Sequence, residues 1–65
     1  MVLKVRDIIK IIVLDGWYLK RTKGSHRQFK HDNKSGLVTV AGHPNDDVPI
    51  KILKSILKQA GIDNV

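Results

Sequence analysis

Residues 17–40, WYLKRTKGSHRQFKHDNKSGLVTV, decide the fold of this 65-residue chain. Three short runs within them mix apolar and polar residues: WYLKR at 17–21, HRQFKH at 26–31 and LVTV at 37–40. Each run is too short for a stable helix, and the breaks between them, TKGS and DNKSG, are rich in turn-forming residues. The segment therefore predicts three antiparallel strands joined by two tight turns into a meander.

An amphipathic helix is predicted before these strands, over residues 3–14. Val5, Ile8 and Ile12 recur there at helical spacing, and polar residues occupy the other side. Gly16 supplies a left-handed stop. The β-branched run in this segment lowers its helix propensity and would also suit a buried strand.

A second helix is predicted after the strands, because the chain from residue 46 onward returns to helical periodicity. Asp47 is the predicted N-cap and Pro49 lies in the first turn, while Lys58 lies in the last turn and Gly61 ends the helix. The predicted apolar stripe consists of Ile50, Leu53, Leu57 and Ala60, widened by Ile52 and Ile56.

The order helix, three strands, helix predicts an α+β fold of one domain spanning residues 1–65. Both helices are expected to cover one face of a three-stranded antiparallel sheet, and the other face is expected to meet water. In the second strand the period-2 rule directs Phe29 toward the helices and His26, Gln28 and Lys30 away from them. His26 is therefore predicted to be exposed.

The charge balance indicates a polyanionic partner. Twelve Lys and Arg residues against six Asp and Glu give a net charge of +6, which attracts nucleic acid or an anionic membrane. The longest apolar run, Ile11–Leu14, is too short to span a bilayer, and no secretory signal is visible. The absence of cysteine excludes disulfides and thiolate metal sites. The expected location is the reducing cytoplasm.

Cations concentrate around the second predicted strand. Between residues 20 and 34 there are six cations and one acid, Asp32. A further group lies on the polar side of the last helix and consists of Lys51, Lys54 and Lys58. Such a row is equally consistent with a solvated helix face. Double-stranded-RNA-binding domains contact phosphates and 2′-hydroxyls from basic helix and loop surfaces, so RNA is favoured over DNA.

Several single residues admit two interpretations. Trp17 could stack an unpaired base, but a small core needs its aromatic residues, so a structural role is favoured. Ser25 is interpreted as a turn residue and not as a nucleophile. A structural or solvated role is favoured for His31, whereas His43 is either a turn residue or a helper in proton transfer. The spacing of the three histidines matches no familiar metal motif.

The sequence resembles the HicA family of bacterial toxins from about Val5 to Ile62. The resemblance rests on DGWYLKRTKGSHRQFKH, on GLVTVAGHPNDD and on ILKSILKQAGI. Many family members carry proline where this chain has Ala41, which leaves the GSH motif untouched. The resemblance implies a fold like that of double-stranded-RNA-binding domains, endoribonuclease activity on messenger RNA and a HicB-type antitoxin partner. It also implies that His26 of the GSH motif is the catalytic residue.

The predicted function is that of a toxin in a type II toxin-antitoxin system, a metal-independent endoribonuclease without cofactors. His26 transfers protons as a general acid or base, because imidazole exists in both protonation forms near neutrality. The chain is expected to form a hetero-oligomer with its antitoxin. A non-catalytic RNA-binding module remains the main alternative, and an architectural DNA binder is a third possibility. The predicted RNA contacts are Lys20, Arg21, Lys23, Gly24, Ser25, Arg27, Lys30, Lys54 and Lys58.

Overall fold

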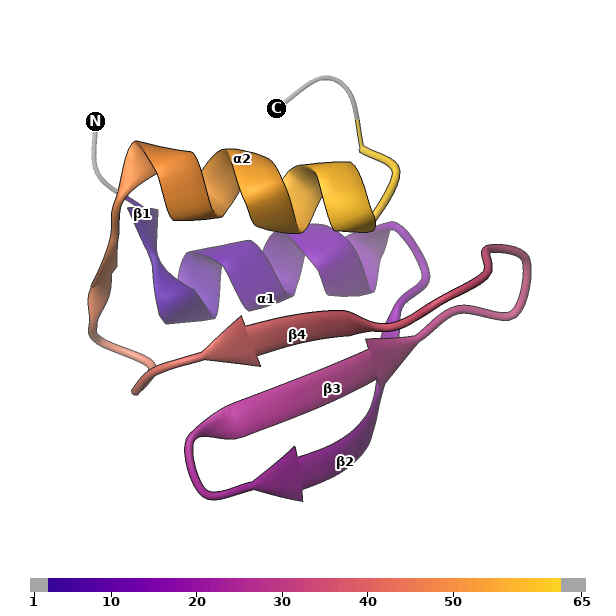
Figure 1. Ribbon diagram of the computed structural model, residues 1–65, viewed down its shortest axis with the longest axis horizontal. Coiled ribbons are helices and arrows are strands. Elements are labelled where there is room, and N and C mark those ends of the chain that lie inside the picture. The colour runs from indigo at the N-terminus through magenta and orange to yellow at the C-terminus, as the bar shows by residue number, and fades with distance from the viewer. Residues whose placement is uncertain (1–2, 63–65) are drawn as a thin grey trace.

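A computed structural model of the chain describes residues 3–62, so the predicted domain of residues 1–65 extends at both ends beyond the described part. The elements follow in the order β1 (Leu3–Lys4), α1 (Val5–Leu14), β2 (Tyr18–Lys23), β3 (His26–Lys30), β4 (Val38–Ala41), β5 (Asp47–Val48) and α2 (Ile50–Gln59). The main elements have the predicted α-β-β-β-α order, which confirms the α+β fold (Figure 1).

The three longer strands form the predicted antiparallel meander, with β3 between β2 and β4. Phe29 of β3 pairs with Val38 of β4, and Arg27 pairs with Val40. Phe29, Val38 and Val40 are buried, so the face of the sheet that carries them is the inner face. The prediction that Phe29 points toward the helices is thus confirmed.

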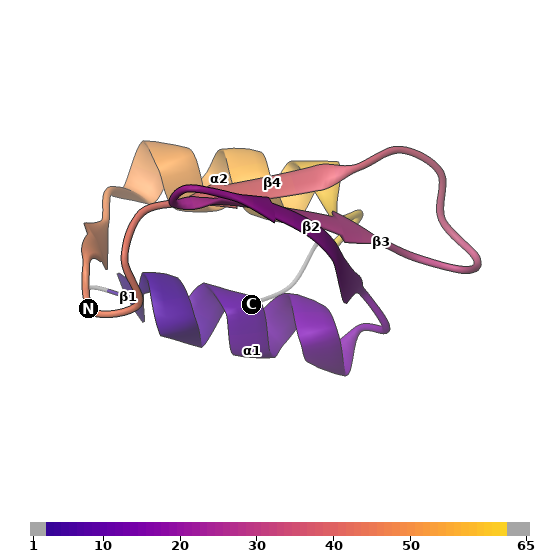
Figure 2. The same ribbon diagram turned by 90° about the horizontal axis from the view of Figure 1, so that it is seen from below.

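Both helices bury side chains against this inner face. Helix α1 lies over one side of the sheet, roughly along the strand direction, and α2 lies beside β4 (Figures 1 and 2). The core combines Val5, Ile8 and Ile12 of α1 with Ile56 of α2 and with Ala60, the residue that follows α2. A core contributed by both helices and one face of the sheet leaves the outer face available for a functional site.

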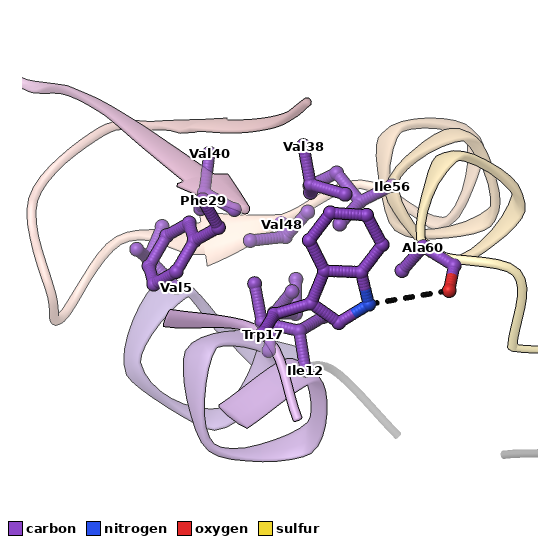
Figure 3. Packing of buried hydrophobic residues seen from close by; sticks show 10 residues of the cluster. Val5, Ile12, Trp17, Phe29, Val38, Val40, Val48, Ile56 and Ala60 are labelled. Atoms are coloured by element: carbon purple, nitrogen blue, oxygen red, sulfur yellow. Dashed lines mark hydrogen bonds between the residues drawn. The ribbon is translucent and has the colours of Figure 1, made fainter. Parts of the chain in front are cut away.

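Trp17 joins the end of α1 to the end of α2. Its ring is buried in the core, and its Nε1–H donates a 3.3 Å hydrogen bond to the carbonyl oxygen of Ala60 (Figure 3). The indole therefore has both its apolar surface and its single donor satisfied inside the protein. The structural role predicted for Trp17 is confirmed.

The starts of both helices differ from the sequence prediction. Leu3 and Lys4 belong to β1, which pairs with β5 through the pairs Leu3–Val48 and Lys4–Asp47, so α1 begins at Val5 and not at residue 3. Asp47 is not the N-cap of α2, because this pairing holds it in an extended strand and its carboxylate bonds Lys4 Nζ at 3.0 Å. Pro49 occupies the cap position without a side-chain hydrogen bond.

The predicted apolar stripe of α2 is too wide. Ile56 and Ala60 are buried and Leu53 is half-buried, whereas Ile50 is 61% exposed and Ile52 is 52% exposed. The buried line runs along the i, i+3, i+7 positions from Leu53 to Ala60. Ile50 and Ile52 lie on either side of that line in the first turn, so neither reaches the core.

Candidate functional site

The candidate site centres on the turn between β2 and β3. Gly24 and Ser25 form a two-residue connection, because the register pairs Lys23 with His26. Gly24 has φ +59°, while Ser25 has an ordinary negative φ. A glycine at the first central position of a two-residue hairpin is typical of a type II′ turn, whose twist matches that of the flanking strands. The GSH motif thus fixes where β3 begins.

His26 is the first residue of β3 and is exposed, as predicted. It lies between Lys23 of β2 and Ala41 of β4 in the sheet register. It belongs to the outer face, because its strand neighbour Arg27 pairs with the buried Val40 of the inner face. A regular strand therefore supports the imidazole on the side of the sheet that is not covered by the helices.

An irregularity in β2 sets which cations accompany His26. Leu19 pairs with Phe29, but the next pair joins Arg21 to Gln28, so Lys20 is an extra residue in a β-bulge. Beyond the bulge the alternation is displaced by one residue, and Arg21 and Lys23 share the outer face with His26. If β2 had no bulge, side chains alternating from Tyr18 would place Lys20 on the outer face, and Arg21 and Lys23 on the inner face.

Arg21, Lys23, His26 and Gln28 line a shallow depression of about 230 Å³ on the outer face. Neither of the two ion pairs among residues 3–62 involves either cation of this depression. Their charge is therefore available to an anion beside the imidazole. Gln28 was not among the predicted contact residues, although its period-2 relation to His26 was a sufficient signal.

Three other predicted RNA-contact residues of this region lie differently. Arg27 is half-buried, and its Nη1–H donates a 2.7 Å hydrogen bond to the carbonyl oxygen of Gly42. Lys20 is exposed at the bulge, and Lys30 lies at the far end of β3, paired with Tyr18. None of these three lines the depression around His26.

The turn residues Gly24 and Ser25 lie at the rim of the same region. A Cβ at Gly24 would meet no atom within 4 Å, so the backbone there is open to a ligand. Ser25 is half-buried, and its carbonyl oxygen accepts a 3.1 Å hydrogen bond from the Gly42 N–H. This bond fixes the turn to the end of β4.

The predicted RNA contacts on α2 are separate from the His26 depression. Lys54 and Lys58 line a second hollow of about 330 Å³, together with Leu57 and Ile62. The two sets of lining residues have no member in common. Any role of the α2 lysines is therefore that of a second contact area.

Lys34, which the sequence placed among the cations near His26, has a structural role instead. Its Nζ donates hydrogen bonds to the Asp15 carboxylate and to the carbonyl oxygens of Ala60 and Gly61. The hydrogen bond from Lys34 is the main cause that lowers the pKa of Asp15 below its ordinary value. The loop between β3 and β4 is thereby tied to the ends of both helices.

His31 also belongs to this structural network. Its Nδ1 accepts a 2.9 Å hydrogen bond from the Asn33 N–H, and its Nε2 lies 2.7 Å from the carbonyl oxygen of Asp15. Because Nδ1 accepts a hydrogen bond, Nε2 is the ring nitrogen that can donate to the Asp15 carbonyl. The ring also packs edge-on against Trp17, with 5.3 Å between the ring centroids. The structural interpretation of His31 is supported.

His43 is exposed in the loop after β4. Its backbone N–H donates to the Asp46 carboxylate, and the preceding Gly42 pairs with Ser25, so His43 lies at the same end of the sheet as the GSH turn. It does not line the His26 depression. Among residues 3–62 no group of three or more His, Cys, Asp or Glu side chains is arranged to hold a metal ion.

The fold and the site together define a small α+β protein with an exposed histidine in a cationic depression of its sheet. Residues 5–62 match the family described as the HicA toxin of bacterial toxin-antitoxin systems, and the chain belongs to this family. Membership supports a role as a toxin and implies an antitoxin partner. No curated protein matches the chain. Within residues 3–62 neither helix has the length and apolar character needed to cross a membrane.

Proposed function

We propose that the protein is a metal-independent endoribonuclease that cleaves messenger RNA and so inhibits translation and growth. The observation that carries the proposal is an exposed histidine at the head of a strand, beside two cations that form no ion pair within the described part of the chain. The toxin family supports the biological role. The expected place of action is the cytoplasm, where the protein would encounter messenger RNA. There it would also form a hetero-oligomeric complex with a HicB-type antitoxin.

The proposed chemistry uses the nucleophile that RNA itself carries. The 2′-hydroxyl attacks the adjacent phosphorus, its proton passes to a base, and the departing 5′-oxygen receives a proton from an acid. An imidazole suits either transfer, because its unperturbed pKa of about 6.5 keeps both forms present near neutrality. His26 would perform one of these transfers. Arg21 and Lys23 would stabilise the negative charge that develops on the phosphorane.

The remaining predicted contacts would hold the RNA chain. Gly24 and Ser25 would let the backbone of the turn approach a phosphate closely. Lys30 would add charge along the outer face, and Lys20 would add charge at the bulge. Lys54 and Lys58 would bind a more distant part of the RNA through their own hollow. Arg27 would act by fixing the loop after β4 through its bond to Gly42.

The test compares the wild-type chain, His26→Ala and a matched control, Thr39→Val, on messenger RNA in the presence of a chelator. Thr39 pairs with Gln28 but does not line the depression. Removal of His26 is expected to reduce cleavage by about 10²–10⁴-fold, the usual contribution of one proton-transfer group. Because His26 is exposed, its removal should leave the unfolding curve unchanged.

Product ends and binding separate the alternatives. A 2′,3′-cyclic phosphate on the products would support attack by the 2′-hydroxyl, whereas a 5′-phosphate would indicate attack by water and contradict the mechanism. RNA retained by all three proteins without cleavage would identify a non-catalytic binding module. Equal affinity for duplex DNA and RNA at moderate salt would instead indicate an architectural DNA binder.

A further inference from the structure

Strand β2 is the uncovered edge of the sheet. Within the described residues it pairs only with β3 (Figure 1). All six of its residues are exposed, whereas β3 and β4 each contain buried residues. An edge strand presents a row of backbone N–H and C=O groups that can pair with another chain. This edge lies directly beside the His26 depression, because Arg21 and Lys23 belong to β2 and line that depression.

The charge of this edge selects its partner. β2 carries Lys20, Arg21 and Lys23 and no acidic residue, and none of them takes part in an ion pair among residues 3–62. A second copy of the chain would bring the same cations to the same edge, and like charges opposite each other are destabilising. The bulge at Lys20 also resists pairing with an identical strand. The complementary occupant is acidic.

An exposed apolar side chain on this edge favours a polypeptide over RNA. Leu19 of β2 is 52% exposed although it shares the inner face with Phe29. A phosphate backbone covers the cations but not this aliphatic side chain. A strand with alternating residues presents carboxylates on one face and apolar side chains on the other.

We propose that an acidic, extended segment of a partner protein adds to the free edge of β2 as a further strand. Its backbone pairs with β2, its carboxylates lie over Arg21 and Lys23, and its alternate apolar residues cover Leu19. The consequence of this docking rests on the proposed function, because the added strand would close the depression around His26 and prevent RNA from entering. The binding itself requires no catalysis and is measured without RNA.

The test uses a short end-blocked peptide of alternating glutamate and valine as the probe. Its binding to isotope-labelled full-length protein is followed by backbone amide NMR shifts and hydrogen exchange. Shifts and protection are expected across Tyr18–Lys23 and not across Val38–Ala41. A peptide methylated on the backbone nitrogens of one edge should bind at least about tenfold more weakly, because it loses main-chain hydrogen bonds. A peptide with its glutamates and valines in separate blocks should also bind more weakly.

Two exposed positions test the chain's own contribution. Lys23→Glu and Leu19→Ser should each weaken binding of the alternating peptide, because the first reverses a charge under the carboxylates and the second removes the apolar contact. The matched control Lys51→Glu makes the same charge change on an exposed position of α2 and should bind as the wild type does.

The proposal is overturned by no binding, by equal binding of the methylated peptide, or by shifts confined to α2. It is also overturned if the β2 amides shift with protein concentration alone, which would indicate self-pairing. Shifts at β2 with a single-stranded RNA but not with the peptide would show that RNA is the occupant. Peptide binding at β2 by a protein that cleaves no RNA would contradict the proposed function and leave the docking site standing.

Discussion

Gly16→Ala is expected to lower the free energy of unfolding by roughly 2–5 kcal/mol. Gly16 links α1 to β2 with φ +105°, and a Cβ there would lie 2.6 Å from Nε2 of His31. The left-handed backbone alone costs a non-glycine residue about 1–2 kcal/mol. Displacing His31 also weakens its bond to the Asp15 carbonyl, worth about 0.5–1.5 kcal/mol, and its edge contact with Trp17, worth a similar amount.

Gly36→Ala is the matched control, because Gly36 has φ +84° and a Cβ added there would meet no atom within 4 Å. It should show only the backbone cost of about 1–2 kcal/mol. Urea unfolding followed by the fluorescence of the single tryptophan, which is buried, measures both variants. The difference between them isolates the contact with His31.

Gly16→Ala in a His31→Ala background completes the test. With the imidazole removed, Gly16→Ala should cost no more than Gly36→Ala, because only the backbone term remains. The reasoning is refuted if Gly16→Ala is no more destabilising than Gly36→Ala in the wild-type background. It is also refuted if the excess cost persists without His31.

Three further predictions concern the helices and their ends. Ile56→Ala should cost about 2–5 kcal/mol and Ile50→Ala less than about 1 kcal/mol in urea unfolding, because the side chains are 4% and 61% exposed; equal costs would contradict the assigned face of α2. The contribution of the Lys34–Asp15 pair to the free energy of unfolding should be complete above the ordinary Asp15 pKa of 3.8. It should disappear as the pH falls through the lowered pKa that Asp15 has in the folded protein. Thermal unfolding against pH should therefore show a shallower acid limb for Lys34→Met, and an unchanged limb would disprove the assignment. Asp47→Ala should change stability by less than about 1 kcal/mol, because its ion pair is exposed and it caps no helix; a larger loss would restore it as the N-cap.

The order of elements could be predicted from the sequence because it depends on local signals. The Gly-Ser turn with φ +59° at Gly24 and the alternation around Phe29 act within a few residues, and both are observed. The exposure of His26 followed from the same alternation. These features required no knowledge of which segments meet in space.

The errors arose where distant segments meet. Asp47 looked like an N-cap from its neighbours, but the chain there is held extended by pairing with Leu3–Lys4, more than forty positions earlier. Lys34 was counted in the positive charge around His26, but the fold brings it to the Asp15 carboxylate and to the carbonyl oxygen of Ala60. Local propensity does not depend on contacts between distant segments, so these two contacts could not be predicted from the neighbouring residues.

The candidate site depends both on a local signal, which the sequence shows, and on a contact between strands, which it does not. Its histidine is placed by a local turn, but its cations are selected by the bulge at Lys20, which inserts one residue opposite β3. Because side chains alternate with period 2, that single insertion exchanges the residues on the two faces of β2, bringing Arg21 and Lys23 beside His26 and leaving Lys20 out. The same bulge disturbs the edge against an identical strand. One irregular residue thus determines both which charges surround the imidazole and which kind of chain can pair alongside them.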